Sequence, residues 1–494
     1  MAVSLQIFEL DPGLEILQAT RAFSGERLLV LLDSAARHRE RDARYSFLTA
    51  DPIADCRLNA VTIHQPVFEQ LRQWQRDMSL VPETDTDGLP PFFGGIAGLL
   101  SYEFGHAFER LPQPAIDEFR SPALLAGLFD WAIVWDHLAK TVRCYVLKFS
   151  AGSGAGAASD EEKPQGNERL EWILSRLQAD PPIQAIHSSE PQTSAMLFAE
   201  QHRIEPSTPI YSSFTRDGYL KAVSRVIEYI RAGDIFQANL SQRLLAEWSS
   251  SAVDLYSRVR QNNPAPFCGL FQADDFAVVS ASPERFLKVD RNHLVETRPI
   301  KGTRRRPRSP IADLFAGDEL SASEKDRAEN VMIVDLLRND ISRNCRTGSV
   351  KVTGLCEIER FETVLHLVST IQGFLGENRD VWDLLGGCFP GGSITGAPKI
   401  RAVEIIAELE PTVRGAYCGS LFALGPAGDF DSSILIRTFT LKNGWVQFPV
   451  GGGIVADSDP LDEYRETLHK ASGLIRTLGR SRDNRKQTEP HSVG

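Results

Sequence analysis

Residues 276–303 read FAVVSASPERFLKVDRNHLVETRPIKGT, and this stretch decides the fold class. Residues 276–280 and 293–297 carry the β-branched and aromatic side chains that favour strands, so we expect two strands there. Elsewhere the helical and strand patterns are mixed without a regular βαβ rhythm. This mixture predicts an α+β fold with largely antiparallel sheets and argues against a doubly wound parallel sheet.

The same stretch ends in RPIKGT, which places Lys301 where a strand enters a tight turn. Side chains and backbone N–H groups at such turns often meet ligands. A partly desolvated lysine amine loses its proton near neutral pH and becomes a nucleophile. The alternative is an ordinary solvated lysine. Glu284, in SPERF at 282–286, follows the first strand and is a candidate acid.

The chain has 494 residues, more than one ordinary core needs, so we expect several segments. We predict an N-terminal domain at 1–150, a flexible insert and linker at 151–209, a second domain at 210–478 and a polar tail at 479–494. The insert contains AGSGAGAAS at 151–159 and many later prolines, which is typical of a loop.

Composition excludes several classes of protein. Hydrophobic residues make up 42% and charged residues 24%, as in a globular protein, and the net charge of −11 argues against nucleic acid as a partner. No apolar run reaches the ~20 residues that span a bilayer, so we expect no membrane segment. The seven cysteines are scattered and show no C-x-x-C spacing, which favours a cytoplasmic protein without a zinc site.

Two acidic pairs are spaced to share a helix face. Asp326 and Glu329 form one pair, and Glu463 and Glu466 form the other, each at i, i+3. Two such faces could converge on one Mg²⁺, which takes oxygen ligands and keeps water and substrate oxygens in its shell. The alternative is two solvated helix faces with ordinary charge.

The predicted helix starts support these pairs. Ser321 and Glu324 fit a capping box ahead of the first pair, and Asp459 before Pro460 fits an N-cap ahead of the second. Thr215 and Gly233 likewise bound a predicted helix between them. Residues 166–179 predict a short amphipathic helix. A further helix follows 389–399, with a predicted apolar face of Ile400, Val403, Ile406 and Leu409.

Two glycine clusters suggest close backbone approach. FPGGSITGAPK at 389–399 leads into a helix N-terminus, which suits an anion, and PVGGGIV at 449–455 ends a strand. Neither has the spacing of a phosphate loop, so a pair of tight turns is the alternative. Two single residues add to the candidates. Arg437 lies in an otherwise apolar strand at 435–441 and needs an anionic partner, and His366 lies in VLHLV at 364–368, where a core histidine is the alternative.

Seven segments together resemble the chorismate-utilising enzymes, the family of anthranilate synthase component I. They are GDIFQANLS at 233–241, SPERF at 282–286, PIKGT at 299–303, DLLRND at 335–340, GGSITGAPK at 391–399, RGAYCG at 414–419 and GGGIV at 451–455. The resemblance implies largely antiparallel sheets packed as a sandwich with flanking helices. It also makes 210–478 the chorismate-binding catalytic domain.

The resemblance implies a ligand set. Mg²⁺ is held by Glu329 and Glu466, with Asp326 and Glu463 behind them. One carboxylate of chorismate completes the metal shell. The other meets a substrate-binding group of Arg437, Tyr417, Gly451, Gly452 and Gly453, and Gly302 and Thr303 line the same pocket.

Within this family, two positions indicate the reaction. Isochorismate-type enzymes carry a lysine that activates water where this chain has Gln237, so water addition is disfavoured. Anthranilate synthases usually carry alanine at the position of Lys301, whereas lysine is typical of aminodeoxychorismate synthases. The resemblance implies that Lys301 attacks ring carbon 2 and that Glu284 is the general acid for the departing 4-hydroxyl. His366 is then expected near that leaving group.

The implied activity is therefore conversion of chorismate and ammonia to 4-amino-4-deoxychorismate, for para-aminobenzoate and folate biosynthesis. The alternative is anthranilate formation for tryptophan biosynthesis. The chain has no glutaminase triad, so a separate glutamine amidotransferase subunit is the expected ammonia donor. LLDS at 31–34 and NPAPF at 263–267 resemble the family's tryptophan site, with Ser34, Pro264 and Phe267 as its residues. Asp33 replaces the usual glutamate there, so tryptophan feedback is not expected, and a structural tryptophan is the alternative.

Overall fold

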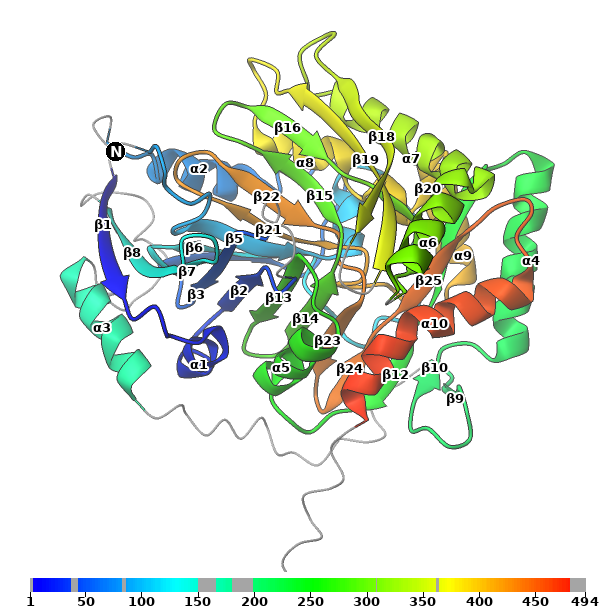
Figure 1. Ribbon diagram of the computed structural model, residues 1–494, viewed down its shortest axis with the longest axis horizontal. Helices are drawn as coiled ribbons and strands as arrows, with labels where there is room; N and C mark the ends of the chain where they lie inside the picture. The colour runs from blue at the N-terminus through cyan, green and yellow to red at the C-terminus, as the bar shows by residue number, and fades with distance from the viewer. Residues whose placement is uncertain are drawn as a thin grey trace, which may run out of the picture.

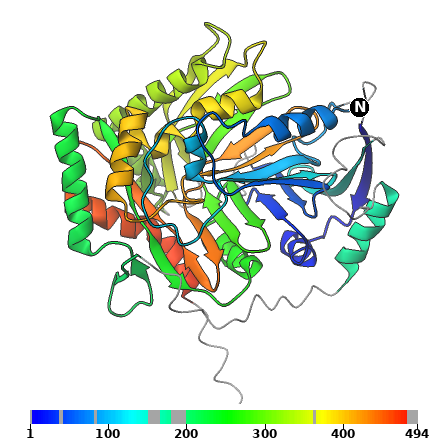
Figure 2. The same ribbon diagram turned by 180° about the vertical axis from the view of Figure 1, so that it is seen from behind.

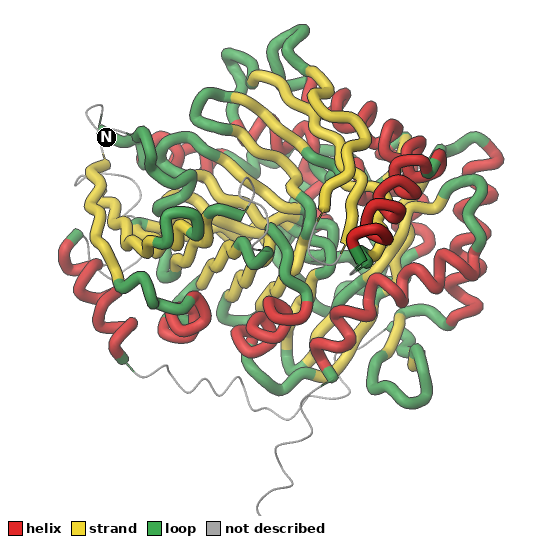
Figure 3. Tube along the Cα trace, in the orientation of Figure 1, coloured by secondary structure: helices red, strands yellow, loops and turns green. Residues whose placement is uncertain are grey.

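The computed structural model describes residues 3–36, 43–81, 86–149, 166–179, 199–307, 309–360 and 364–479. Most of the predicted insert at 151–209 and all but the first residue of the predicted tail at 479–494 lie outside the described residues. Two large sheets lie face to face, and the helices lie mainly on their outer sides and ends (Figures 1 and 3). The predicted α+β class with a sandwich of largely antiparallel sheets is confirmed.

The larger sheet has twelve strands, and each neighbouring pair is antiparallel. Strands from before residue 150 and strands from after residue 199 both contribute to it. In sheet order the strands are β1 (Val3–Leu10), β8 (Thr141–Phe149), β7 (Trp131–Asp136), β3 (Tyr45–Thr49), β2 (Leu29–Asp33), β13 (Phe267–Gln272), β14 (Ala277–Ser282), β23 (Thr438–Lys442), β24 (Trp445–Gln447), β12 (Leu244–Glu247), β10 (Tyr211–Ser212) and β9 (His202–Arg203).

The second sheet has ten strands, and it also combines strands from both halves of the chain. In order they are β17 (Ile300–Arg305), β19 (Val364–Phe374), β16 (Leu294–Thr297), β15 (Arg285–Val289), β22 (Phe430–Ser433), β21 (Ser420–Leu424), β5 (Gly95–Leu100), β6 (Leu124–Phe129) and β4 (Ala54–Leu58), with β18 (Lys351–Arg360) also paired to β19. A third, small sheet consists of β20 (Gly396–Ala397), β11 (Gln237–Gln242) and β25 (Val450–Ile454).

The helices of the described residues are mostly short. They are α1 (Ile16–Ala22), α2 (Glu69–Asp77), α3 (Asn167–Gln178), α4 (Arg216–Ala232), α5 (Ala252–Asn262), α6 (Pro310–Ala322), α7 (Glu324–Ser342), α8 (Val381–Cys388), α9 (Lys399–Leu409) and α10 (Pro460–Leu478), with 3₁₀ turns η1 (Tyr102–Ala107) and η3 (Gly392–Ile394). Over the described part of the chain, none of these helices combines the length and the hydropathy that crossing a bilayer requires.

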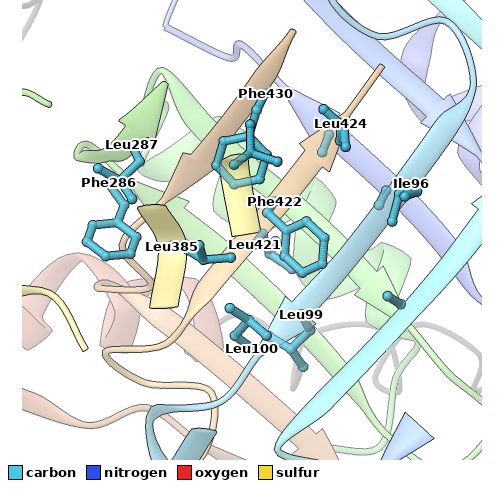
Figure 4. Close-up of a cluster of buried hydrophobic side chains, with 14 of the residues drawn as sticks. Ile96, Leu99, Leu100, Phe286, Leu287, Leu385, Leu421, Phe422, Leu424 and Phe430 are labelled. Atoms are coloured by element: carbon cyan, nitrogen blue, oxygen red, sulfur yellow. The ribbon is translucent and has the colours of Figure 1, made fainter. Parts of the chain in front are cut away.

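The main core fills the space between the two large sheets. Val278 on β14 and Leu421 on β21 belong to one buried cluster, although their strands lie in different sheets. Figure 4 shows the part of this cluster on β5, β21 and β22, where the ring centres of Phe422 and Phe430 lie 6.3 Å apart. Because inward-facing apolar side chains of both sheets are removed from water here, this core provides the rigid base from which the site residues project.

Local chemistry explains where two of these helices begin or end. The Thr215 side chain accepts a hydrogen bond from the Gly218 N–H at 2.9 Å, and Gly233 ends α4 at φ +85°, so both predicted boundaries are confirmed. Asp459 caps α10 by accepting from the N–H groups of Leu461 and Asp462, as predicted. The predicted helix at 166–179 is also confirmed as α3.

Three local predictions are wrong. Ser323, not Ser321, caps α7, because Ser321 still belongs to the last turn of α6. Ile400 is 44% exposed, since the buried face of α9 is formed by Ala402, Val403, Ile405 and Ile406. The strand predicted at 435–441 begins only at Thr438, because the residue before it has a left-handed backbone.

Candidate active site

Lys301 lies beside a bulge at the edge of the ten-stranded sheet. It pairs with Leu367 across β17 and β19, whereas Thr303 pairs with His366, so Gly302 is the extra residue in β17. Gly302 has φ +78°, which glycine adopts without strain. The bulge re-aims the side chains around it, and bulges of this kind are common beside active sites.

The Lys301 amine is enclosed and weakly hydrogen-bonded. Its Nζ donates to the carbonyl of Ser393 at 3.3 Å. Burial lowers the pKa of Lys301 from its usual value, while the nearby carboxylates of Glu329 and Glu284 oppose that shift. A lysine in these surroundings is a better nucleophile than a solvated one because more of it is neutral.

Glu284 is the acid partner in the same pocket. Its side chain is buried, and burial raises its pKa to about 7, an effect that a hydrogen bond from Ser393, the charge of Lys301 and the backbone of Ile300 reduce. A carboxyl group with this pKa is protonated in a substantial fraction of molecules at neutral pH, as a general acid requires. Ser393 therefore contacts both reactive groups. In the sequence, Ser393 is visible only as part of the glycine-rich motif at 389–399.

The four predicted metal ligands come from α7 and α10, which lie close together on one side of the molecule (Figure 1). Burial raises the pKa of Glu329, and the charges of Asp326 and Glu466 raise it further. A Cβ on Gly452 would lie 3.2 Å from Glu463 Oε2 and 3.6 Å from Glu466 Oε1, so both α10 carboxylates face β25. The structure thus brings the two acidic faces within electrostatic range of each other.

Cations of the chain contact two of these carboxylates. Arg304 Nη2 lies 2.9 Å from Asp326 Oδ2, and Lys470 Nζ lies 2.7 Å from Glu466 Oε1. Within the described ranges, no group of three or more His, Cys, Asp or Glu side chains is arranged closely enough to hold a metal ion. Lys470 also donates to the Gly451 carbonyl at 3.0 Å, and the i, i+4 spacing from Glu466 is the signal that predicts this pair.

Arg437 is a half-buried cation without a counter-charge among the residues that the structure describes. Burial alone lowers the pKa of its guanidinium, and that group has no hydrogen-bond or ion-pair partner among the residues described. Its backbone is left-handed at φ +52°, an uncommon conformation that clusters at ligand sites. The sequence prediction that this arginine needs an anionic partner therefore stays a prediction, and the partner has to come from outside the described chain. Burial also raises the pKa of Tyr417, whose ring lies 5.8 Å from the guanidinium carbon of Arg414.

Two different structural reasons explain why β25 has glycine at three positions. A Cβ on Gly451 would lie 2.5 Å from the Leu240 carbonyl oxygen, and a Cβ on Gly453 would clash with the Gln237 side chain. These two glycines let β25 pair closely with β11. Gly452 instead faces the carboxylates of α10, so it is the glycine that opens space on the side of the acidic residues.

His366 and Thr303 form a pair across the bulge. The Thr303 hydroxyl and His366 Nδ1 are 2.8 Å apart, and His366 is buried while Thr303 is exposed. The hydrogen bond fixes the histidine ring to β17 one residue beyond Gly302. It connects His366 to the strand of Lys301 rather than to Lys301 itself.

The residues predicted for tryptophan lie in the twelve-stranded sheet. The buried Asp33 carboxylate accepts hydrogen bonds from Ser46 at 2.7 Å and from Tyr256 and Arg260 at 2.6 Å each. The N–H of Ser34 donates to the Ser46 hydroxyl at 3.2 Å. Pro264 follows α5, and Phe267 begins β13 under the Arg285 guanidinium, whose carbon lies 5.0 Å from the ring centre.

A partly buried amine, a buried acid, an arginine without a counter-charge in the described part of the chain and two acidic helix faces form a candidate enzyme site. The chain belongs to the chorismate binding enzyme family, whose model matches residues 30–476. It is therefore an enzyme of the class that acts on chorismate.

Individual relatives fall into two activities. The chain is 38% identical over 448 residues to "Aminodeoxychorismate synthase component 1" of Escherichia coli, covering 88% of this chain and 90% of the relative. It is 40% identical over 395 residues to "Anthranilate synthase component 1" of Pseudomonas aeruginosa, covering 79% and 76%. Among solved structures, anthranilate synthase component I from Streptococcus pneumoniae matches with a TM-score of 0.70 at 29% identity, covering 88% of this chain and 92% of that one.

Proposed function

We propose that this chain is an aminodeoxychorismate synthase component 1, a transferase that converts chorismate and ammonia to 4-amino-4-deoxychorismate. Overall identity does not separate this activity from anthranilate formation, because relatives of both kinds are about equally similar. The observation that carries the proposal is Lys301, a desolvated lysine beside the buried acid Glu284. Within the family this chain resembles, lysine at this position is typical of aminodeoxychorismate synthases and alanine of anthranilate synthases.

In the proposed reaction, the neutral amine of Lys301 attacks ring carbon 2 of chorismate. The 4-hydroxyl leaves as water after accepting a proton from Glu284, and the ring double bonds shift. Ammonia then bonds to carbon 4, and the bond between carbon 2 and Lys301 breaks, so the amine is regenerated. The enolpyruvyl group stays on the product. The hydrogen bonds of Ser393 hold the amine and the acid in position for both steps.

The chemistry of the four side chains suits Mg²⁺, because they offer only carboxylate oxygens, although the described geometry does not bring three of them together. Burial raises the pKa of Glu329, and the charges of Asp326 and Glu466 add smaller contributions in the same direction. In this proposal Glu329 and Glu466 hold the ion, with Asp326 and Glu463 behind them. When bound, Mg²⁺ would neutralise a substrate carboxylate and withdraw charge from the ring. The ion pairs of Asp326 and Glu466 would open or lengthen on binding.

The second carboxylate of chorismate is assigned to Arg437, Tyr417 and the backbone of Gly451, Gly452 and Gly453. Its charge would give the half-buried Arg437 guanidinium the anionic partner that the described residues do not supply. Gly302 and Thr303 would border the same pocket, and His366 would be held near the leaving hydroxyl through Thr303.

Ammonia would come from glutamine through a separate amidotransferase subunit, since the relatives' names describe them as component 1. We further propose that the chain works in the cytoplasm, in the synthesis of para-aminobenzoate for folate. At the Ser34, Pro264 and Phe267 site, the three hydrogen bonds already made by Asp33 argue against regulation by tryptophan.

The deciding experiment gives the purified chain chorismate, Mg²⁺ and an ammonium salt and identifies the product by mass. We expect a product that retains the enolpyruvyl group and carries one amine in place of one hydroxyl. Fluorescent anthranilate with released pyruvate as the main product would overturn the proposal in favour of anthranilate synthase. No conversion with ammonium, but conversion with glutamine and an added amidotransferase, would support the activity and show that ammonia must be delivered by the partner.

A further inference from the structure

Strand β19 is flanked by a bulge on each side. On one side, Gly302 is the extra residue of β17, next to Lys301. On the other side, β18 has an extra residue between Gly354 and Glu357. The proposed reaction uses the first bulge but not the second. Because both bulges border the same short stretch of β19, a change in the second would reach the strand that lies opposite Lys301.

Side chains hold the second bulge in place. Cys356 lies in this bulge with a left-handed backbone at φ +55°, which is uncommon for a residue other than glycine. Its N–H donates to the Ser369 hydroxyl on β19 at 2.9 Å. That hydroxyl in turn donates to Oδ1 of Asn330 on α7. The bulge is thus joined to the helix that carries Glu329.

The Asn330 side chain is fully buried, and both ends of its amide are engaged. Its Nδ2 donates to the Leu367 carbonyl at 3.3 Å, and its Oδ1 accepts from the Cys356 thiol at 3.7 Å as well as from Ser369. An amide oxygen accepts two hydrogen bonds, so Oδ1 has no capacity left for a ligand. With its oxygen saturated and its surface buried, Asn330 can act only through the residues that it holds.

The neighbours of Asn330 adjoin the proposed active site. Glu329 precedes it on α7. Leu367, whose carbonyl it binds, is the cross-strand partner of Lys301. His366 precedes Leu367 on β19. One buried amide therefore connects the helix of a proposed metal ligand to the strand opposite the proposed nucleophile.

We propose that Asn330 is a positioning residue, which fixes the separation between Glu329 on α7 and Lys301 on β17 by joining α7 to β19. This inference rests on the proposed function, in which both residues act in the reaction. The pairing of β19 with β17 transmits the position of Leu367 to Lys301. A displacement of about 1 Å in a reacting group can lower the rate about 100-fold, so loss of the amide should affect catalysis more than substrate binding.

Two variants of the full chain remove the Asn330 donor in different ways. Asn330→Leu removes the whole amide, whereas Asn330→Asp keeps its shape but offers no N–H to the Leu367 carbonyl. We expect both to lower kcat about 10–100-fold and to change the KM for chorismate less than about threefold, because Arg437 and the β25 glycines are untouched.

Thr49→Val is the matched control. It removes a buried hydrogen bond of 2.7 Å to the Trp131 carbonyl, in the twelve-stranded sheet. We expect this variant to lower the Tm without changing kcat, so it separates lost stability from lost positioning. A fall in kcat in the folded Asn330 variants no larger than in Thr49→Val would overturn the proposal.

Chemical labelling tests the same assignment without turnover. In the absence of chorismate, acetic anhydride labels Lys301 and Lys221, an exposed lysine of α4, and peptide masses give the ratio of the two rates. Both Asn330 variants should raise the Lys301 rate relative to Lys221 at least about twofold, because local opening exposes the partly buried amine. Thr49→Val should leave the ratio at its wild-type value.

Ser369→Ala provides the measurement if neither Asn330 variant folds. It keeps the donor to Leu367 but removes one hydrogen bond to the Asn330 oxygen, so the labelling ratio should rise by less. An unchanged ratio in every folded variant would contradict the role of Asn330, whatever product the wild type makes. Anthranilate as the wild-type product would instead overturn the proposed function and leave the labelling result intact.

Discussion

The side chains of Arg414 and Lys301 donate to neighbouring carbonyls in the turn around η3, those of Ile394 and Ser393. The two charged clusters differ in how completely their polar groups are hydrogen-bonded. Arg414 donates to the carbonyls of Ile394 and Asn239 and to both oxygens of Glu410. Lys301 donates to the neighbouring Ser393 carbonyl at 3.3 Å. Figure 2 shows α9, which precedes Glu410, on the face opposite that of α10. A fully paired cluster fixes the turn, whereas a weakly paired one leaves its charges free for a ligand.

The comparison is tested most strongly by removing the Lys301 amine. We expect Lys301→Ala to lower kcat at a fixed ammonia concentration by about 10⁴-fold or more, as loss of a covalent nucleophile does elsewhere. The product formed can be followed by mass. Lys221→Ala, an exposed lysine on α4, is the control and should retain activity. Turnover unchanged by Lys301→Ala would refute covalent catalysis by this residue, and recovery with an added small amine would support it.

Arg414 should contribute mainly to stability. Arg414→Met removes one partner of a buried ion pair and leaves Glu410 without its cation, so the free energy of unfolding should fall by about 3–5 kcal/mol. Arg225→Met breaks the exposed pair with Glu228 on α4 and should lower the free energy of unfolding far less, because water screens that pair. Denaturant unfolding measures both variants. Equal losses would show that burial does not distinguish the two pairs.

Some features of the site and its surroundings can be predicted from the sequence, and others cannot. Helix caps such as Thr215 and Asp459 are local, so short motifs located α4 and α10 correctly. Lys301 and Glu284 were predicted because strand ends and family motifs mark them. The contacts of Ser393 with Lys301 and Glu284 depend on segments far apart in the chain. No local pattern specifies such contacts, because tertiary packing decides which donors find acceptors.

The Lys301 cluster lies beside the bulge at Gly302, and this bulge distinguishes its backbone geometry from that of the Arg414 cluster. Gly302→Ala places a side chain at φ +78° and brings its Cβ within 3.0 Å of both Asp326 and Leu320. We expect a loss of about 1–3 kcal/mol in stability and a fall in kcat from displacement of Lys301. Gly233→Ala is matched in φ at +85° but has nothing within 4 Å, so it isolates the backbone strain. Equal stability losses with unchanged kcat would show that the bulge does not position Lys301.

The pH profile gives the smallest and most specific effect. Glu284 acts as an acid in this proposal and has its pKa raised to about 7 by burial, so the fraction of molecules with a protonated Glu284 should fall about tenfold per pH unit well above that value. Lys301 acts in its neutral form, and its lowered pKa makes activity rise with pH on the acidic side. The result is a bell-shaped profile of kcat/KM, measured at a constant concentration of neutral ammonia. Ser393→Ala removes a hydrogen bond that lowers the pKa of Glu284, so the limb of the profile that Glu284 controls should move to higher pH. Glu284→Gln should abolish that limb at reduced activity, and an alkaline limb that survives in this variant would assign the acid to another group.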